Sequence, residues 1–540
     1  MKLLSKASTL EESIIKMQEV LDNVGCKMHF SPQKHPLENC YSVNLSSHEA
    51  PSYIYSNGKG ILAAASMASA LGEYIERLQT NNFFSDFYLP SRRHYPDEKV
   101  FEFGGDFLNA ELLNIYDPHG ELSDEDLIDF NSDLTDEIVT LPFTKHNDGK
   151  KVYFPVNILA NLYVSNGLAA GNTPKEAQVQ ALSEIYERYA KLQIIKNGYA
   201  LPKFPSEIIE SFERVYEDIR ILKERGFIVE VLDASLGGIF PVTAISLINP
   251  SNSSLFVSFG AHPIPEVSLE RSMTELMQGR DLNELDAFEV PTFDMSLVAD
   301  SFNLESHFID SNGKLGFGFL STKKSFEFSS WRYAGERIEE EFEYLVSIAE
   351  NMEKDIYIRE YDYLGFYSCQ ILIPGISEVY PIDDLVYNNK NGAKALRDMV
   401  LNFEEYEAED ILEAVESLDD SLNMGKYIGV IFKNDFNMSL FKAQIYLLLG
   451  DKESALEFLM FSNDKTANVL AELIRMNEAE LEFEEYADAL YNIFTRQRVE
   501  KALRILEEKE YLCDTSLHED YINMLNMYDR LEQKKSEIYR

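Results

Sequence analysis

The sequence is short of basic residues. Its 540 residues include 49 lysines and arginines against 92 aspartates and glutamates, which gives a formal net charge of −43. Because contacts with a phosphate backbone need clustered lysine and arginine, this shortage argues against a broad nucleic-acid-binding surface. An acidic surface is compatible with a basic partner protein, or with a surface that is simply well hydrated. We therefore expect no direct binding of nucleic acid.

Cysteine and long apolar runs are also scarce. Cys26, Cys40, Cys369 and Cys513 are scattered along the chain without a C-x-x-C pair. This pattern argues against a disulfide framework or a zinc site and favours reduced thiols. No uncharged segment has both the length and the apolarity of a membrane span, and the closest, residues 61–71, is mostly alanine and serine. The N-terminal residues turn acidic before an apolar stretch of signal-peptide length. We therefore expect a cytoplasmic protein without a membrane segment.

Proline and glycine are rare in the last part of the chain. From residue 382 to residue 540 there is no proline, and leucine, glutamate, alanine and tyrosine recur at helical spacing. This composition predicts an all-helical domain over residues 386–540. Within it, Tyr446, Gly450 and Ala455 stand where a helix–turn–helix repeat of the tetratricopeptide (TPR) type places them. A plain helical hairpin accounts for these three residues nearly as well.

Residues 1–385 mix helix and strand signals. Because these signals do not alternate as a regular βαβ series, the predicted fold class is α+β. A polar, aspartate-rich stretch over about residues 85–149 is interpreted as a loop-rich insertion, and a helix is predicted over Thr9–Asn23. Segments rich in β-branched and aromatic residues predict strands at Tyr41–Leu45, Ser52–Tyr55, Lys151–Phe154, Phe227–Leu232, Val242–Leu247 and Ser254–Phe259.

The sequence also contains an internal duplication. Ser69–Arg77 (SALGEYIER) and Gln180–Arg188 (QALSEIYER) are identical at five of nine positions. Each copy follows a Ser-Asn-Gly triplet, Ser56–Gly58 in the first and Ser165–Gly167 in the second, which we interpret as a turn. We therefore predict a strand–turn–helix unit that occurs twice.

Helical geometry gives the duplication a chemical meaning. At about 100° per residue, Ser69, Glu73 and Glu76 fall within a sector of roughly 60°. Buried carboxylates that lie side by side repel each other and are costly to desolvate, a conflict that divalent cations resolve. Oxygen ligands favour Mg²⁺ over zinc, and Mg²⁺ usually completes its coordination with phosphate oxygens. The second copy aligns four residues within roughly 80°, namely Glu176, Gln180, Glu184 and Glu187.

An ordinary structural interpretation competes with this one. Glu73 with Arg77, and Glu184 with Arg188, are also i,i+4 ion pairs of the kind that decorate many helix surfaces. The repetition of the pattern on two apolar helices favours the metal interpretation. Arg77 and Arg188 would then reach either the carboxylates or a phosphate.

A third helix is predicted to begin at Pro265, a residue well suited to the first helical position. Arg271 and Glu275 share one face of it and would add a cation and a ligand, although alone they form a common helical salt bridge. The sequence has no GxxxxGK[ST] motif, which excludes a P-loop. Ser56–Gly60 (SNGKG) is rich in glycine but too short to serve by itself as a phosphate cradle.

Together these motifs resemble the nucleotide-binding signature of YcaO proteins. The three helices occur in the family's order, and the resemblance covers about residues 1–385. It implies that ATP and Mg²⁺ bind, and that ATP activates a peptide backbone amide oxygen by phosphoryl transfer before a nucleophile adds. It also implies roles for individual residues. Mg²⁺ would be held by Glu73, Glu76, Glu176, Glu184, Glu187 and Glu275. The nucleotide would be contacted by Lys6, Ser13, Ser69, Asn172, Gln180, Arg188 and Arg271.

One departure from the family concerns the C-terminal residues. Azoline-forming members commonly end in a proline-rich tail, whereas this sequence ends LEQKKSEIYR and has its last proline at Pro381. We therefore favour the branch implicated in β-methylthiolation of an aspartate in a ribosomal small-subunit protein. The partners implied are a radical methylthiotransferase and a basic ribosomal protein, and the resemblance also implies a homodimer. Two alternatives stay open: an azoline- or thioamide-forming enzyme, and a non-catalytic ATP-binding scaffold.

Overall fold

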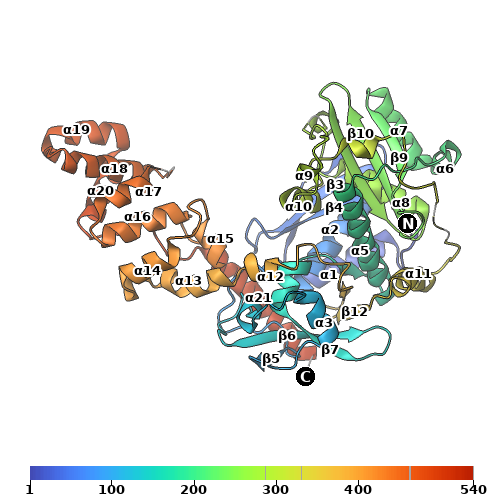
Figure 1. Cartoon of the computed structure of the whole chain (residues 1–540), viewed down its shortest axis with the longest axis horizontal. Coiled ribbons are helices and arrows are strands. Elements are labelled where there is room, and N and C mark those ends of the chain that lie inside the picture. Colours follow the sequence, from blue (N-terminus) through green and yellow to red (C-terminus); the bar gives the residue numbers. More distant parts are fainter. Residues whose placement is uncertain (286, 330, 332, 461, 463, 539–540) are drawn as a thin grey trace.

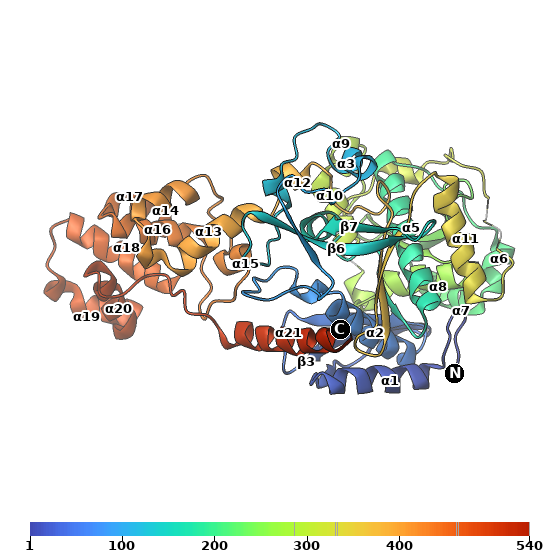
Figure 2. The same ribbon diagram turned by 90° about the horizontal axis from the view of Figure 1, so that it is seen from below.

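The structure is a computed structural model that describes residues 1–538 except 286, 330, 332, 461 and 463. A body of sheets and helices contains the first part of the chain, and an arm of helices extends from one side of it (Figure 1). The last helix runs back from the arm to the body (Figure 2). No helix of the described residues is both long and apolar enough to cross a membrane. The four cysteines are buried free thiols.

Within the described residues the strands form three antiparallel sheets, so the predicted α+β class is confirmed. In the first sheet β3 pairs with β1, β2 and β4, and in the second β10 lies between β9 and β11. The third has the order β5-β6-β12-β13-β8, with β7 beside β6. The bounds are β1 (Met28–Phe30), β2 (Lys34–Leu37), β3 (Cys40–Ser47), β4 (Tyr55–Gly60), β5 (Lys99–Glu102), β6 (Glu137–Lys145), β7 (Lys151–Pro155), β8 (Leu168–Gly171), β9 (Ile228–Asp233), β10 (Val242–Asn249), β11 (Ser254–Ala261), β12 (Tyr357–Tyr361) and β13 (Tyr367–Leu372).

Three helices of the body matter most for the site: α2 (Ala63–Gln79), α5 (Pro174–Asn197) and α8 (Pro265–Met277). Helix α1 (Leu10–Asn23) begins with a capping box in which Thr9 and Glu12 satisfy each other's backbone N–H groups. The other helices of the body are α3 (Ala110–Tyr116), α4 (Val156–Ile158), α6 (Ser206–Ser211), α7 (Glu213–Glu224), α9 (Met295–Val298), α10 (Ser301–Ile309) and α11 (Ile338–Asn351).

The duplicated unit is present, but its first copy differs from the prediction. Residues Ser56–Gly58 are not a turn; they lie in β4, where Gly58 pairs with Val43 of β3. The strand predicted at Ser52–Tyr55 is also misplaced, because Ser52 lies in a turn and β4 begins at Tyr55. The turn predicted from these glycines is therefore wrong, because here they allow a helix to approach the strand and do not reverse the chain.

The second copy agrees with the prediction. Ser165–Gly167 forms a turn, with Gly167 at φ 78°, and leads into β8. Helix α5 then begins after Thr173, whose side chain accepts a hydrogen bond from the Glu176 N–H, and has Pro174 in its first turn. The two copies therefore supply β4–α2 and β8–α5.

The segment predicted as a loop-rich insertion takes part in the sheet of the body. It contributes β5 and β6, and β6 also pairs with β7 and β12. Most of the remaining residues between 85 and 136 form loops around α3. Long polar connections therefore surround two strands, of which β6 (EIVTLPFTK) has the β-branched and aromatic residues typical of a strand.

All described elements after β13 are helical. The helices α16 and α17 form a hairpin in which Tyr446 stacks on Phe458 with ring centroids 5.5 Å apart, and Gly450 between them has φ 75°. Whether this hairpin is a repeat of the TPR type stays a prediction. The bounds are α12 (Asp384–Tyr387), α13 (Asn391–Leu401), α14 (Ala408–Val415), α15 (Met424–Ile428), α16 (Met438–Leu448), α17 (Lys452–Leu459), α18 (Lys465–Glu478), α19 (Phe483–Phe494), α20 (Arg496–Leu506) and α21 (Glu519–Ile538).

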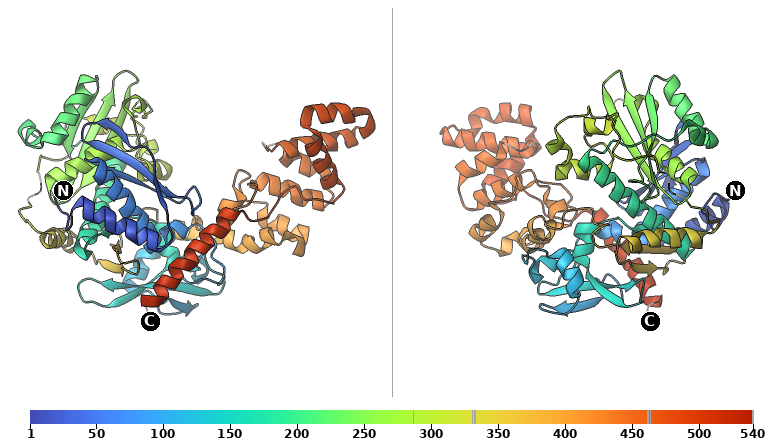
Figure 3. Two further views of the ribbon diagram at one scale, coloured as in Figure 1. Left: turned by 180° about the vertical axis from the view of Figure 1, so that it is seen from behind. Right: turned by 45° about the vertical axis from the view of Figure 1, so that its right-hand side comes forward.

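Helix α21 anchors the arm to the body (Figure 3). The buried Lys535 ammonium donates hydrogen bonds to Asn81 Oδ1 at 2.6 Å and to the His94 carbonyl at 2.8 Å. It also lies 4.3 Å from the centre of the Tyr95 ring. Because Asn81 follows α2 by two residues, α21 is fixed to the C-terminal end of a helix that carries predicted metal ligands.

Candidate functional site

A cavity of about 780 Å³ lies between α2, α5, α8 and the N-terminal segment. Every residue predicted to bind nucleotide or metal lines it, although these residues come from distant parts of the chain. They are Lys6, Ser13, Ser69, Glu73, Glu76, Asn172, Glu176, Gln180, Glu184, Glu187, Arg188, Arg271 and Glu275. The structure thus brings them together, while their roles remain predictions.

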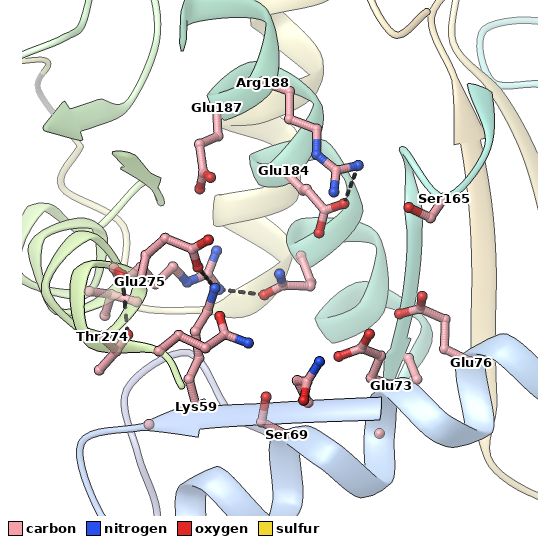
Figure 4. Close-up of a pocket in the computed structure, with 18 of the residues that line it drawn as sticks. Lys59, Ser69, Glu73, Glu76, Ser165, Glu184, Glu187, Arg188, Thr274 and Glu275 are labelled. Carbon is pink, nitrogen blue, oxygen red and sulfur yellow. Dashed lines mark hydrogen bonds and ion pairs between the residues drawn. The ribbon is translucent and has the colours of Figure 1, made fainter. Parts of the chain in front are cut away.

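The two duplicated helices face each other across the cavity (Figure 4). On α2, Arg77 lies 3.6 Å from Glu73 and 3.5 Å from Glu76. On α5, Arg188 lies 2.8 Å from Glu184. The i,i+4 pairs expected as the ordinary interpretation do form, but they form inside a cavity and not on the outer surface. The motif therefore forms the ordinary i,i+4 ion pairs, and it also places the glutamates in a cavity, as the metal interpretation expects.

The N-terminal segment closes one end of the cavity. Lys6 lies 3.4 Å from Glu176, and the Ala7 N–H donates a hydrogen bond to the same carboxylate at 3.0 Å. Ser13 donates to Asn172 Oδ1 at 3.2 Å, and Asn172 donates to Glu176 Oε1 at 3.3 Å. Lys6 and Ser13, which the family resemblance implied, therefore lie beside the start of α5.

Helix α8 contributes the third wall. Arg271 donates hydrogen bonds to Gln180 Oε1 at 2.6 Å and to the Ala261 carbonyl at 2.8 Å. Glu275 forms an ion pair with Lys59, which reaches it from β4 (Figure 4). Gln180 and Arg271, predicted from different motifs, are thus direct partners.

Burial changes the pKa values of charged side chains in the site. Burial is the largest cause that raises the pKa of Glu76 to about 8; Arg77 opposes this rise, and Glu73 and Glu184 add to it. Burial also raises the pKa of Glu187, against the opposing charge of Lys59. Burial lowers the pKa of Arg271, while Glu187 and Glu184 act in the opposite direction. Carboxylates in this situation gain from any additional cation in the cavity.

The donor set fits Mg²⁺ in kind, because carboxylate oxygens are the ligands that this ion prefers. Among the described residues, however, no group of three or more acidic, histidine or cysteine side chains converges as a metal cage. Basic side chains pair with the glutamates instead: Arg77 with Glu73 and Glu76, Arg188 with Glu184, and Lys59 with Glu275. The glutamates would have to rotate away from these partners in order to share an ion.

Several residues of the site were not predicted. The sequence motifs assign no role to Lys59, and the signal that could have identified it is its position between Gly58 and Gly60. Ser5 carries no sequence signal, yet it donates a hydrogen bond to Glu341 and lies 3.0 Å from His262 Nε2. Because His262 Nδ1 accepts from the Ile264 N–H, Nε2 carries the proton and donates to Ser5. This arrangement ties the N-terminal segment to the wall and is not that of a serine hydrolase.

Comparison with known proteins agrees with the geometry. The family model described as YcaO cyclodehydratase, ATP- and Mg²⁺-binding, matches residues 57–377. The chain therefore belongs to the YcaO family.

Two relatives are similar over most of their lengths. One is the Escherichia coli protein named ribosomal protein S12 methylthiotransferase accessory factor YcaO, 36% identical over 99% of this chain and 98% of that protein. The other is an uncharacterized protein of Haemophilus influenzae, 39% identical over 86% of this chain and 84% of that protein.

Solved structures are more distant. A YcaO protein from Methanopyrus kandleri bound with AMPPCP and Mg²⁺ is 17% identical, with a TM-score of 0.44 over 72% of this chain and 96% of that one. A heterocyclase in complex with substrate and cofactor is 19% identical, with a TM-score of 0.47 over 69% of this chain and 53% of that one.

Proposed function

We propose that this protein binds ATP with Mg²⁺ in the cavity between α2, α5 and α8. We further propose that it uses ATP to activate a peptide backbone amide, or to assist the modification of a ribosomal small-subunit protein. The observation that carries the proposal is the convergence of glutamates and basic side chains from four separate segments on one cavity. Membership of a family described as ATP- and Mg²⁺-binding supports it.

The basic and the acidic residues of the cavity would have different roles. Arg188, Arg271 and Lys6 would oppose the negative charge of the phosphates, and their anchoring would keep the nucleotide in one orientation. The glutamates of α2, α5 and α8 would hold Mg²⁺, which when bound neutralises charge on the phosphates during transfer. Transfer of a phosphoryl group to an amide oxygen turns that oxygen into a good leaving group. The protein's own contribution is therefore mainly positioning.

The accessory role rests on the relative from Escherichia coli, which is named for it and is similar over nearly the whole chain. By that similarity we propose a radical methylthiotransferase and a basic ribosomal small-subunit protein as partners. The net charge of −43 supports a basic partner, because opposite charges steer association. A homodimer is proposed from the family resemblance alone.

Nucleotide binding tests the first step. We expect the purified protein to bind ATP in the presence of Mg²⁺, and Glu184→Gln and Glu187→Gln to weaken that binding at least about tenfold, or ~1.4 kcal/mol. Glu224→Gln is the matched control, because Glu224 lies on the exposed face of α7 with 61% of its side chain accessible. If the wild-type protein binds no ATP, the proposed function is wrong.

The proposed role in modifying a ribosomal protein is tested by measuring the masses of ribosomal proteins. Their masses, measured in cells with and without this gene, should differ by one modification if the accessory role is right. Unchanged masses together with ATP turnover would favour an azoline- or thioamide-forming enzyme. Full cellular function in variants that have lost ATP binding would instead favour a non-catalytic scaffold.

A further inference from the structure

On strand β4, Lys59 stands between Gly58 and Gly60, and these two glycines fix its position. A Cβ atom at Gly58 would lie 1.9 Å from the Ser66 carbonyl oxygen, and one at Gly60 would lie 2.7 Å from Ala65 Cβ. Both glycines are therefore pressed against α2, with no room for a side chain. Because successive strand residues face opposite sides, Lys59 projects away from this contact and into the cavity.

The Lys59 ammonium lies among carboxylates from three helices. It forms its ion pair with Glu275 of α8. Glu184 and Glu187 of α5 and Glu73 of α2 line the same cavity, and their charges oppose the lowering of the Lys59 pKa by burial. These four glutamates belong to the set predicted to hold Mg²⁺. Figure 4 shows the lysine rising from the strand toward Glu275, between the walls that the helices form.

We propose that Lys59 is a built-in counter-cation of these glutamates, which competes with a free divalent cation for them. An ammonium and a divalent ion repel each other and need the same oxygens, so each disfavours the other in this space. The inference rests on the metal site of the proposed function. It adds that Lys59 determines when this site accepts a divalent cation. Free Mg²⁺ binds weakly, whereas Mg²⁺ that arrives with a nucleotide brings phosphate oxygens to which Lys59 can turn.

The pair of Lys59 and Glu275 has the properties that such an exchange needs. About a third of each side chain is accessible, 33% for Lys59 and 30% for Glu275, so both can exchange partners with a solute. The lysine stem has four rotatable carbon–carbon bonds, which let the ammonium move while the backbone stays fixed. A sealed ion pair that only stabilised the fold would not line a cavity.

The test measures metal binding without nucleotide. Mn²⁺, a spectroscopic substitute for Mg²⁺, is titrated into wild-type protein and into Lys59→Met, and free Mn²⁺ is followed by electron paramagnetic resonance. We expect Lys59→Met to bind Mn²⁺ about tenfold more tightly than wild type, and Lys59→Arg to resemble wild type because it keeps the charge. Equal affinity in Lys59→Met and wild type would overturn the inference, as would tighter binding by Lys59→Arg.

Lys34→Met is the matched control, because it removes another partly exposed lysine from an ion pair, with Glu284 at 3.1 Å, outside the cavity. We expect it to leave Mn²⁺ affinity unchanged. If circular dichroism shows that Lys59→Met does not fold, Lys59→Gln takes its place with the same expected result.

The two proposals fail separately. Lack of ATP binding by the wild-type protein would remove the proposed function but leave the Mn²⁺ comparison valid. Normal ATP binding with no change of Mn²⁺ affinity in Lys59→Met would remove only the role of Lys59.

Discussion

The two copies of the duplicated unit have the same architecture but different contents. In the first, β4 carries Lys59 into the cavity. In the second, Gly171 of β8 meets α5 as Gly60 meets α2, and the residue before that glycine is Ala170, which has no charge to offer. Helix α2 contributes Glu73 and Glu76, whereas the longer α5 adds Glu176 and Gln180 before its own pair. The two copies thus share the strand–helix architecture but differ in their side chains. The first places a lysine in the cavity, and the second places a longer row of polar residues there.

The largest effect is expected from the glycines that hold each strand in place. Gly58→Ala would put a Cβ 1.9 Å from the Ser66 carbonyl oxygen, and Gly167→Ala would put one 2.1 Å from the Ile371 carbonyl oxygen at a φ of 78°. We expect each to lower the free energy of unfolding by about 3 kcal/mol, measured by urea denaturation.

Gly72→Ala, inside α2, is the control for this prediction. Its new Cβ would have Met17 Sδ at 3.8 Å as its nearest neighbour, so we expect a gain of about 1 kcal/mol from helix propensity. A loss at Gly58 but not at Gly167 would mean that only the first copy needs its close contact.

The next effect concerns pH. Burial raises the pKa of Glu76 from 4.5 to about 8, so the folded protein keeps a proton that the unfolded chain releases. Stability without metal should therefore fall as pH rises from about 4.5 to about 8. We expect Glu76→Gln to be more stable than wild type by about 2 kcal/mol at pH 6, and equally stable near pH 4.5.

Thermal unfolding in a chelator at several pH values measures this difference. The counterpart Glu187, whose pKa burial also raises, should show the same sign. A constant difference between Glu76→Gln and wild type at every pH would contradict the prediction.

The smallest effect distinguishes the starts of the two helices. Thr173 caps α5 by accepting the Glu176 N–H, whereas within the described part of the chain no side chain caps α2 at Leu62. We expect Thr173→Ala to lower the free energy of unfolding by about 1 kcal/mol, and Thr173→Ser to restore most of it. Equal stability of Thr173→Ala and wild type in chemical denaturation would show that the cap is dispensable.

Much of the site could be predicted from the sequence, because a helix converts spacing into direction. The alignment of Glu73 with Glu76, and of Glu184 with Glu187, required only the helical period and the duplication. The predicted start of the third helix at Pro265 is confirmed for the same local reasons. Family membership is confirmed by comparison, and the helical character of residues after 382 agrees with their composition.

What the sequence could not supply depends on contacts between distant segments. Glycine at Gly58 and Gly60 indicated a turn, because the close approach of α2 that demands glycine there is a tertiary contact. The pairing of β6 with β12 joins residues about two hundred positions apart, and no local signal marks it. The partner of Glu275 was equally hidden, since Lys59 meets it only after the chain has folded, whereas the pairs of Arg77 and Arg188 followed from helical spacing.

Lys535 has a mechanical consequence for the whole molecule. Withdrawing its ammonium would leave Asn81 Oδ1 and the His94 carbonyl without this donor inside the body, so the end of α21 resists being pulled away. The far end of α21 is therefore held at Asn81 and His94, in the segment that follows the helix bearing Glu73 and Glu76. Any change in how the arm sits on the body would be felt next to that helix.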